Sequence, residues 1–358
     1  TTNAGQGANP KAMSTPDAGF VKTHSEVADA LAEGRPVVAL ETAVLPHGLP
    51  RDGQPAPSCL RADGRVAELI GGPPAWDADA PLNLQAVGLL GQAVRHAGAV
   101  PAVIAMIDGT LRIGLDDREL EALALDETAA KASNRDFGPL SARRASAGTT
   151  VAASMTACRL AQPAPIRVFA TGGIGGVHRG WSTRPDISAD LKALSTEPVL
   201  VVASGAKVIL DLPATLEALD TLGVPVIGFG TDALPIFTAG LSDDLKVPHR
   251  LDDARSIAAA CRRHWTDFGQ TSGMLVANPC PTEDSIDPHR MDVLVDAGLA
   301  RAAAQGIDGS GVTPFLLSSM ISDLDLNPIS ANISLLISNA SLAAKIAVDW
   351  QDETESRS

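Results

Sequence analysis

The feature that most constrains the fold is a series of short apolar runs, separated by segments with helical spacing. These runs are predicted as strands over residues 36–42, 101–107, 166–171, 198–203, 224–229 and 273–277. Helices are predicted over about 24–33, 84–97, 117–131, 149–160, 187–195, 207–222, 252–268, 289–304 and 329–349. This alternation predicts an α/β fold in three α-β-α layers, with a central β-sheet between two layers of helices.

A chain of 358 residues with 45% hydrophobic content can bury one large core. We therefore expect a single α/β catalytic domain over residues 23–350. Residues 1–22 lack periodicity and are predicted to be a disordered tail, and 351–358 a frayed one. A loop rich in Pro, Gly, Ala and Asp is inserted at about 51–82. It is interpreted either as a rim on which Trp76 stacks a bulky ligand or as a solvated spacer.

The formal net charge of −14 argues against nucleic acid or an anionic membrane as a partner. No apolar run is expected to span a membrane and no signal-peptide pattern opens the chain, so a cytoplasmic location is expected. The four cysteines lack Cys-x-x-Cys spacing, which disfavours a structural metal or a disulfide framework. An anionic small molecule would need a local cluster of cations, for which the candidates are Lys131, Arg135, Arg179 and Lys207.

Lys207 is a candidate nucleophile because it follows the buried run 198–203 through a glycine turn. At the start of a helix over 207–222, burial and the helix dipole would both favour its neutral amine. The alternative is a surface lysine in the first helical turn.

The glycine-rich segment 172–180 follows another predicted strand and includes His178 and Arg179. Its spacing fits neither the dinucleotide fingerprint nor the P-loop, so it is predicted to be a phosphate-binding loop of another kind, unless its glycines only allow close packing. Asp186 and Asp190 lie four residues apart at a predicted helix start. Carboxylates of this kind suit a hard cation and not zinc.

Several motifs, in order along residues 24–349, resemble the pseudouridine-5′-phosphate glycosidase family, also described as indigoidine-synthase-A-like. They are Ala39–Pro50, Gly98–Gly109, Lys131–Asp136, Gly148–Ser154, Phe169–Gly180, Asp186–Leu191, Ser204–Lys207, Val276–Pro279, Val312–Phe315 and Ala331–Ser334. The resemblance implies an enzyme that forms or cleaves a carbon–carbon glycosidic bond at C1 of ribose 5-phosphate.

The resemblance also implies roles for individual residues. Lys207 would form an imine with C1 of the sugar, and Glu41 would donate and accept the proton. The implied substrate-binding residues are Lys131, Val151, Thr171, His178, Ser188, Ala189, Asp190 and Asn332. Asp186 would hold manganese or magnesium, and the family's assembly implies a homotrimer.

Two departures bear on the acceptor. The insert at 51–82 is longer than in most of the family, and Asn134 stands where the family has the first of two arginines. With the alanine-rich, lysine-poor composition, they resemble the alnumycin C-glycosynthase type. The expected function is therefore C-ribosylation of an aromatic polyketide in antibiotic biosynthesis. The alternatives are a pseudouridine-5′-phosphate glycosidase, which Asn332 favours, and a non-catalytic sugar-phosphate-binding protein.

Overall fold

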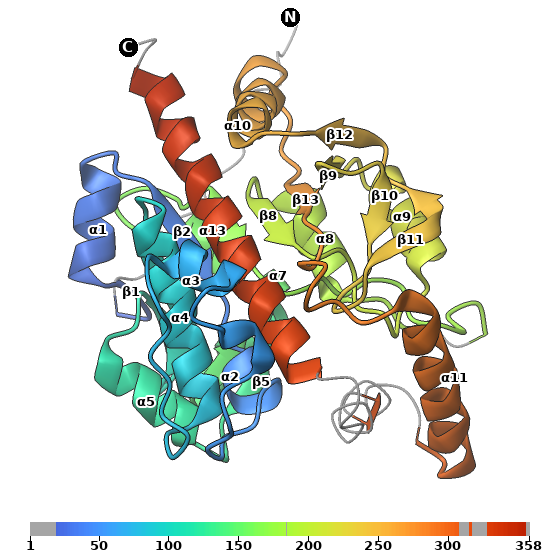
Figure 1. Ribbon diagram of the computed structural model, residues 1–358. Helices are drawn as coiled ribbons and strands as arrows, with labels where there is room; N and C mark the ends of the chain where they lie inside the picture. The colour runs from blue at the N-terminus through green and yellow to red at the C-terminus, as the bar shows by residue number, and fades with distance from the viewer. Residues whose placement is uncertain (1–18, 184, 308–314, 317–327, 356–358) are drawn as a thin grey trace, which may run out of the picture.

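The computed structural model describes residues 19–183, 185–307, 315–316 and 328–355, and a mixed β-sheet lies at its centre (Figure 1). Nine strands follow the order β1-β4-β3-β2-β7-β8-β13-β9-β12, β6 also pairs with β3, and β5 pairs with β6. Among the described pairs of this sheet, β3 is antiparallel to β4 and β6, and the others are parallel. Its strands are β1 (Val21–Thr23), β2 (Val37–Leu40), β3 (Val100–Ile107), β4 (Thr110–Ile113), β5 (Ala130–Ala132), β6 (Ala147–Thr149), β7 (Val168–Ala170), β8 (Leu200–Ala203), β9 (Val226–Phe229), β12 (His249–Leu251) and β13 (Met274–Ala277). A separate hairpin pairs β10 (Ala233–Pro235) with β11 (Leu241–Lys246).

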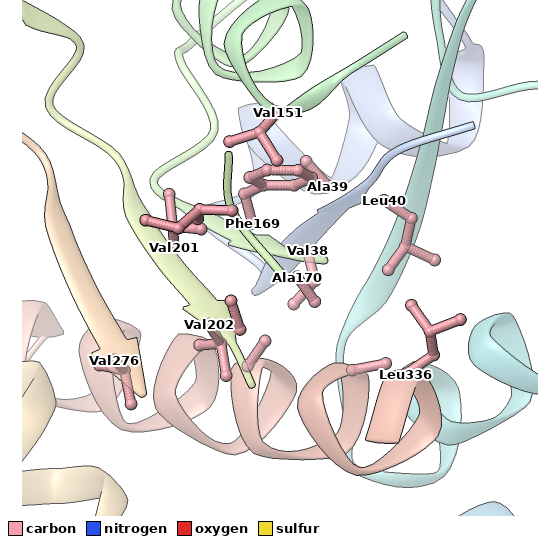
Figure 2. Close-up of a cluster of buried hydrophobic side chains, with 14 of the residues drawn as sticks. Val38, Ala39, Leu40, Val151, Phe169, Ala170, Val201, Val202, Val276 and Leu336 are labelled. Carbon is pink, nitrogen blue, oxygen red and sulfur yellow. The ribbon is translucent and has the colours of Figure 1, made fainter. Parts of the chain in front are cut away.

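Helices cover both faces of the sheet, which confirms the predicted α/β layers. The described α-helices are α1 (Ser25–Ala32), α2 (Val44–His47), α3 (Arg65–Ile70), α4 (Leu82–His96), α5 (Asp117–Leu125), α6 (Phe137–Ala142), α7 (Val151–Leu160), α8 (Ala189–Thr196), α9 (Leu212–Thr221), α10 (Ala254–Arg262), α11 (Pro288–Ala304) and α13 (Pro328–Glu355). Figure 2 shows Phe169 and Val151 on one side of the strands, and Val202 with Leu336 of α13 on the other. The central strands are buried on both faces, and their sequences are therefore continuous apolar runs.

Helix α13 is apolar because it is a core helix. The segment Pro328–Asp352 is long and apolar enough to cross a membrane, contrary to the expectation from the sequence, but 83% of its most apolar window is buried inside the protein. It packs against α4, α10 and the central strands β2, β7 and β8.

Helix α9 begins at Leu212, so the prediction of a helix from Lys207 was wrong. Asp211 is the N-cap and accepts a hydrogen bond from the Ala214 amide, which places Pro213 in the first turn. Proline is tolerated there, whereas in a helix starting at residue 207 it would remove an interior hydrogen bond. The macrodipole argument for Lys207 therefore fails.

Other helix and strand boundaries also differ from the predicted ones. Helix α5 ends at Leu125, where the Asp126 carboxylate accepts the Thr128 amide, so Lys131 lies on strand β5 and not on a helix. Strand β1 includes two residues assigned to the N-terminal tail, and α13 continues through residues assigned to the C-terminal one. Residues 1–18 of the N-terminal tail lie outside the described residues.

The insert at 51–82 packs against the protein and is not structureless. It includes α3 and a short 3-10 helix, and Cys59 and Val66 are buried. The Cys59 amide donates to the Ser330 hydroxyl at 2.8 Å, which joins the insert to the start of α13. Trp76 is half-buried, and its indole donates to the Gln54 carbonyl at 2.9 Å.

Candidate active site

The polar residues that follow the central strands meet at one edge of the sheet. Strands β2, β7, β8 and β13 are adjacent and parallel, so their carboxyl ends point the same way. The first residues beyond these ends are Glu41, Thr171, Ser204 and Asn278, and Lys207 follows Ser204 by three positions. This is the edge at which α/β sheets bind ligands.

Glu41 is held by the neighbouring strand end, because the Thr171 hydroxyl donates a hydrogen bond to its carboxylate. Burial raises the pKa of Glu41 above that of an ordinary glutamate, while Lys207 and the hydrogen bond from Thr171 oppose this increase. A carboxyl group with a raised pKa keeps its proton to higher pH, as a general acid requires.

A tight turn presents Lys207 beside this carboxyl group. The Lys207 amide donates to the Ile174 carbonyl at 3.1 Å, and the Ile174 amide donates to the Gly205 carbonyl at 3.0 Å. Gly205 has a φ of 69°, and a Cβ there would lie 2.0 Å from the Pro235 carbonyl oxygen. Only glycine fits this turn, so the turn fixes the backbone position of Lys207 beside the cavity.

A cavity of about 390 Å³ brings together most of the residues predicted for the site. The predicted residues in its lining are Glu41, Lys131, Val151, His178, Asp186, Ser188, Ala189, Asp190 and Lys207. Arg135 and Thr150 line it as well. One cavity therefore contains an amine, a carboxyl group that tends to hold its proton, and further cations.

A second cavity of about 110 Å³ adjoins the first, because Glu41, Ala43, Lys131 and Lys207 line both. The rest of its lining is Val44, His47, Gly48, Gly172, Gly173, Phe237, Asn332 and Leu336. Among the predicted binding residues, Asn332 lines only this second cavity and Lys131 lines both. Thr171 lines neither of these cavities and reaches the site through its hydrogen bond to Glu41.

Phe237 and Leu336 were missed by the sequence analysis. Phe237 lies in the turn between β10 and β11, which shows no apolar periodicity, and Leu336 looks like any other core leucine of α13. A leucine four residues after Asn332 on a helix shares its face, which was the one available signal.

Lys131 is a second amine near Glu41. Lys131 is an exposed residue of β5, yet partial desolvation of its amine in the cavity and the nearby Lys207 lower its pKa, while Glu41 opposes this shift. Its position on β5 gives it access to both cavities.

Close packing accounts for part of the glycine loop, and four of its amides are not available to the predicted phosphate. The amides of Ile174, Gly175, Val177 and His178 already donate to protein acceptors. A Cβ on Gly176 would lie 2.4 Å from the Thr215 hydroxyl oxygen. The Thr215 side chain approaches the loop backbone closely because glycine permits it.

Asp190 anchors the loop, because both of its carboxylate oxygens are occupied by backbone amides. The Ala152 amide donates to Oδ1 at 3.0 Å and the Gly175 amide donates to Oδ2 at 2.8 Å. The side chain is buried and joins the first turn of α7 to the glycine loop. Asp190 also lines the larger cavity, so its contact with substrate stays a prediction.

We expect Asp190→Asn to destabilise the protein by about 1–3 kcal/mol, because the new amide nitrogen cannot accept a hydrogen bond from a buried N–H. Urea unfolding of both proteins measures the change. Asp244→Asn on the exposed strand β11 is the control and should stay within about 0.5 kcal/mol of the native protein. Equal unfolding midpoints for Asp190→Asn and the native protein would contradict the anchoring role.

Arg179 does not belong to the cation cluster that the sequence predicted. Its guanidinium pairs with Asp296 at 3.2 Å and Asp292 at 3.8 Å, both on α11, and it lines neither cavity. His178 does line the larger cavity, with Nδ1 3.8 Å from Oδ2 of Asp186.

Asp186 could hold a divalent cation only as part of an open site. The described residues contain no group of three His, Cys, Asp or Glu side chains that could enclose a metal. The Asp186 side chain is 40% exposed in the cavity lining. Magnesium and ions like it commonly bind through one or two carboxylates, water and substrate phosphate oxygens, so this donor set fits manganese or magnesium and not zinc.

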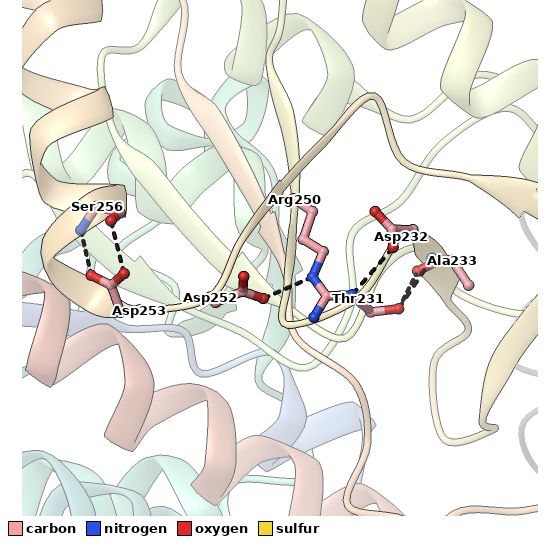
Figure 3. A network of polar contacts seen from close by, with 7 residues as sticks. All are labelled: Thr231, Asp232, Ala233, Arg250, Asp252, Asp253 and Ser256. Atoms are coloured by element: carbon pink, nitrogen blue, oxygen red, sulfur yellow. Dashed lines mark hydrogen bonds and ion pairs between the residues drawn. The ribbon is translucent and has the colours of Figure 1, made fainter.

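A larger groove of about 570 Å³ lies at the amino ends of β9, β12 and β13, where Pro225, His249 and Met274 line it. Its Arg250 is already paired, with Asp252 at 2.7 Å and Asp232 at 3.2 Å (Figure 3). Ligands of α/β sheets bind at the opposite edge, so volume alone does not make this groove the active site.

Comparisons with known proteins show which proteins the chain is similar to. Residues 77–349 match the family described as "Indigoidine synthase A like protein". A pseudouridine-5′-phosphate glycosidase of Paracoccus denitrificans is 44% identical over 324 residues, which cover 90% of this chain and 95% of the relative. One of Dinoroseobacter shibae is 44% identical over 92% of this chain and 97% of its own length.

Two solved structures share the fold. The prealnumycin C-glycosynthase AlnA, in complex with ribulose 5-phosphate, has a TM-score of 0.78 at 33% identity, over 96% of this chain and all of its own. An indigoidine synthase A-like protein of Thermotoga maritima has a TM-score of 0.74 at 29% identity, over 93% of this chain and 97% of its own.

Proposed function

The chain is an enzyme of the pseudouridine-5′-phosphate glycosidase family, described also as indigoidine synthase A-like, and from this premise we propose that it cleaves pseudouridine 5′-phosphate to uracil and ribose 5-phosphate. Curated relatives at 44% identity carry that name, whereas the aromatic C-glycosynthase is 33% identical. The glycosidase therefore replaces the C-ribosylating synthase, which the sequence alone had favoured.

The size of the smaller cavity carries this proposal. Its volume of about 110 Å³ is well below the roughly 300–1,000 Å³ of pockets for drug-sized ligands, and it suits a single ring. Asn332 supplies an amide that can pair with a pyrimidine imide. The argument for a larger acceptor rested on the insert, yet Trp76 and the rest of 51–82 line neither cavity.

We assign the sugar phosphate to the larger cavity. Lys131, Arg135 and His178 line it, as do Thr150 and Val151 at the N-terminus of α7. The Thr150 hydroxyl is buried and has no hydrogen-bond partner within the described part of the chain, so it is available to a substrate oxygen. Cations and a helix N-terminus together favour a phosphate there.

The chemistry follows from placing C1 of the sugar where the cavities meet. The Lys207 amine adds to C1 as the ring oxygen leaves and takes a proton. Glu41 protonates C5 of the pyrimidine, and the C1–C5 bond breaks with its electron pair remaining on the pyrimidine. Uracil departs, and water hydrolyses the iminium left on Lys207 to ribose 5-phosphate and the free amine. The overall reaction consumes one water per bond cleaved.

A divalent cation at Asp186 would neutralise phosphate charge when bound, and we propose manganese or magnesium for this role. His178 lies next to Asp186 and would orient the phosphate from the other side.

Incubation of the purified protein with pseudouridine 5′-phosphate should release equal amounts of uracil and ribose 5-phosphate, measured by chromatography. In the synthetic direction, we expect uracil to be preferred over a bicyclic phenol by roughly 10–100-fold, which is the cost of overpacking a close-fitting site. Faster reaction of the phenol would restore the synthase function. Absence of both products, with ribose 5-phosphate bound, would leave a sugar-phosphate-binding protein.

A further inference from the structure

The smaller cavity contains an aromatic side chain to which no role has been assigned. Phe237 is half-buried and lines this cavity with Asn332 and Leu336. Aromatic residues make up only 3% of the chain, so one beside the proposed ring-binding compartment is unusual.

The glycine pair at the end of β7 makes room for this ring. A Cβ on Gly173 would lie 2.8 Å from Cδ2 of Phe237, and one on Gly172 would lie 3.0 Å from its Cε2. Any side chain at either position would have to push the ring out of place. The position of the phenyl ring therefore accounts for glycine at both positions.

The backbone around Phe237 is also fixed. Thr238 has a φ of 60°, a conformation that β-branched residues rarely adopt, and its carbonyl accepts the Ile286 amide at 2.9 Å. The Phe237 amide donates to the Ala206 carbonyl at 3.4 Å, in the turn that presents Lys207. Strained residues that persist beside a cavity indicate a position that the surrounding structure determines. The backbone segments that carry Phe237 and Lys207 are therefore joined by a hydrogen bond.

We propose that Phe237 is the surface against which the pyrimidine ring packs, so that C5 of the base lies next to C1 of the sugar on Lys207. This inference rests on the proposed function. The Asn332 amide pairs with the polar imide edge of the base, whereas Phe237 contacts its π system. An offset-stacked or edge-on arrangement of the two rings is compatible with both contacts.

The test uses the synthetic direction at saturating ribose 5-phosphate. Phe237→Leu should raise the apparent KM for uracil about 2- to 12-fold, the range expected for loss of an aromatic pair. The yield of the borohydride-trapped ribose 5-phosphate adduct should not change, because that step precedes binding of the base. Phe237→Tyr should keep KM within about twofold. Phe229→Leu is the matched control, since Phe229 is also half-buried but lies on β9 outside both cavities.

A second measurement does not depend on folding of a variant. Dihydrouracil retains the imide edge of uracil but loses its planar π system, so it should inhibit the native enzyme about 2- to 12-fold more weakly than uracil. Equal inhibition by the two compounds, or an unchanged uracil KM in folded Phe237→Leu, would overturn the role of Phe237. A native enzyme that forms no adduct and releases no uracil would instead refute the proposed function itself.

Discussion

Replacing Lys207 by alanine should abolish the covalent adduct with ribose 5-phosphate and lower cleavage of pseudouridine 5′-phosphate by about 10⁴-fold or more. Loss of a covalent nucleophile costs this much, because the remaining groups can only bind and polarise the substrate. Lys207 lies where the two cavities meet, and the Gly205 turn fixes its position. Alanine fits there without disturbing that turn.

Borohydride trapping followed by intact-mass measurement and peptide mapping checks this prediction. Lys192→Ala, on the exposed side of α8, is the control and should trap as well as the native protein. The rival amine is Lys131, because partial desolvation lowers its pKa and it lines both cavities. An adduct that persists in Lys207→Ala and maps to Lys131 would show that the nucleophile had been assigned to the wrong lysine.

The central strands and the edge that carries the site could be predicted because both depend on local signals. Strands buried on both faces leave unbroken apolar runs, and polar residues directly after them lie at the carboxyl edge. Glu41, Thr171 and Asn278 follow this rule. Strand β11 could not be predicted in this way, because its side chains are largely exposed and it contains no apolar run.

The start of α9 was missed although a local signal was present. Asp211 followed by Pro213 is an N-terminal signature, but the apolar spacing from Lys207 outweighed it. The error matters for the chemistry, because it attributed the reactivity of Lys207 to a helix dipole. The structure supplies a different context, in which Glu41 and Lys131 are the charged groups near the amine.

The acceptor compartment could not be predicted because segments far apart in the sequence build it. Gly172 comes from the loop after β7, Phe237 from the β10–β11 turn and Asn332 from α13. The insert was misjudged for a similar reason. Its composition resembles a solvated loop, yet Cys59 and Val66 are buried against residues far away in the sequence.

Glu41→Gln should slow cleavage by about 10²–10⁴-fold, which is the usual contribution of a general acid, while ribose 5-phosphate still forms its adduct on Lys207. The protonated carboxyl group is the form that delivers a proton to C5. Burial raises the pKa of Glu41, so this form persists to higher pH than in an ordinary glutamate. The native kcat for cleavage should therefore fall as pH rises through the raised pKa, and this limb should be absent from the glutamine variant.

Thr171→Val separates this proton role from a purely structural one. The Thr171 hydroxyl stabilises the ionised carboxylate, so its loss should raise the pKa of Glu41 further and move the falling limb of kcat to higher pH. The measurement is the pH dependence of single-turnover cleavage in the native protein and both variants. If Thr171→Val lowered the rate equally at every pH, the hydroxyl would only support the strand end. A limb that survived in Glu41→Gln would belong to another group, and Glu41 would not be the proton donor.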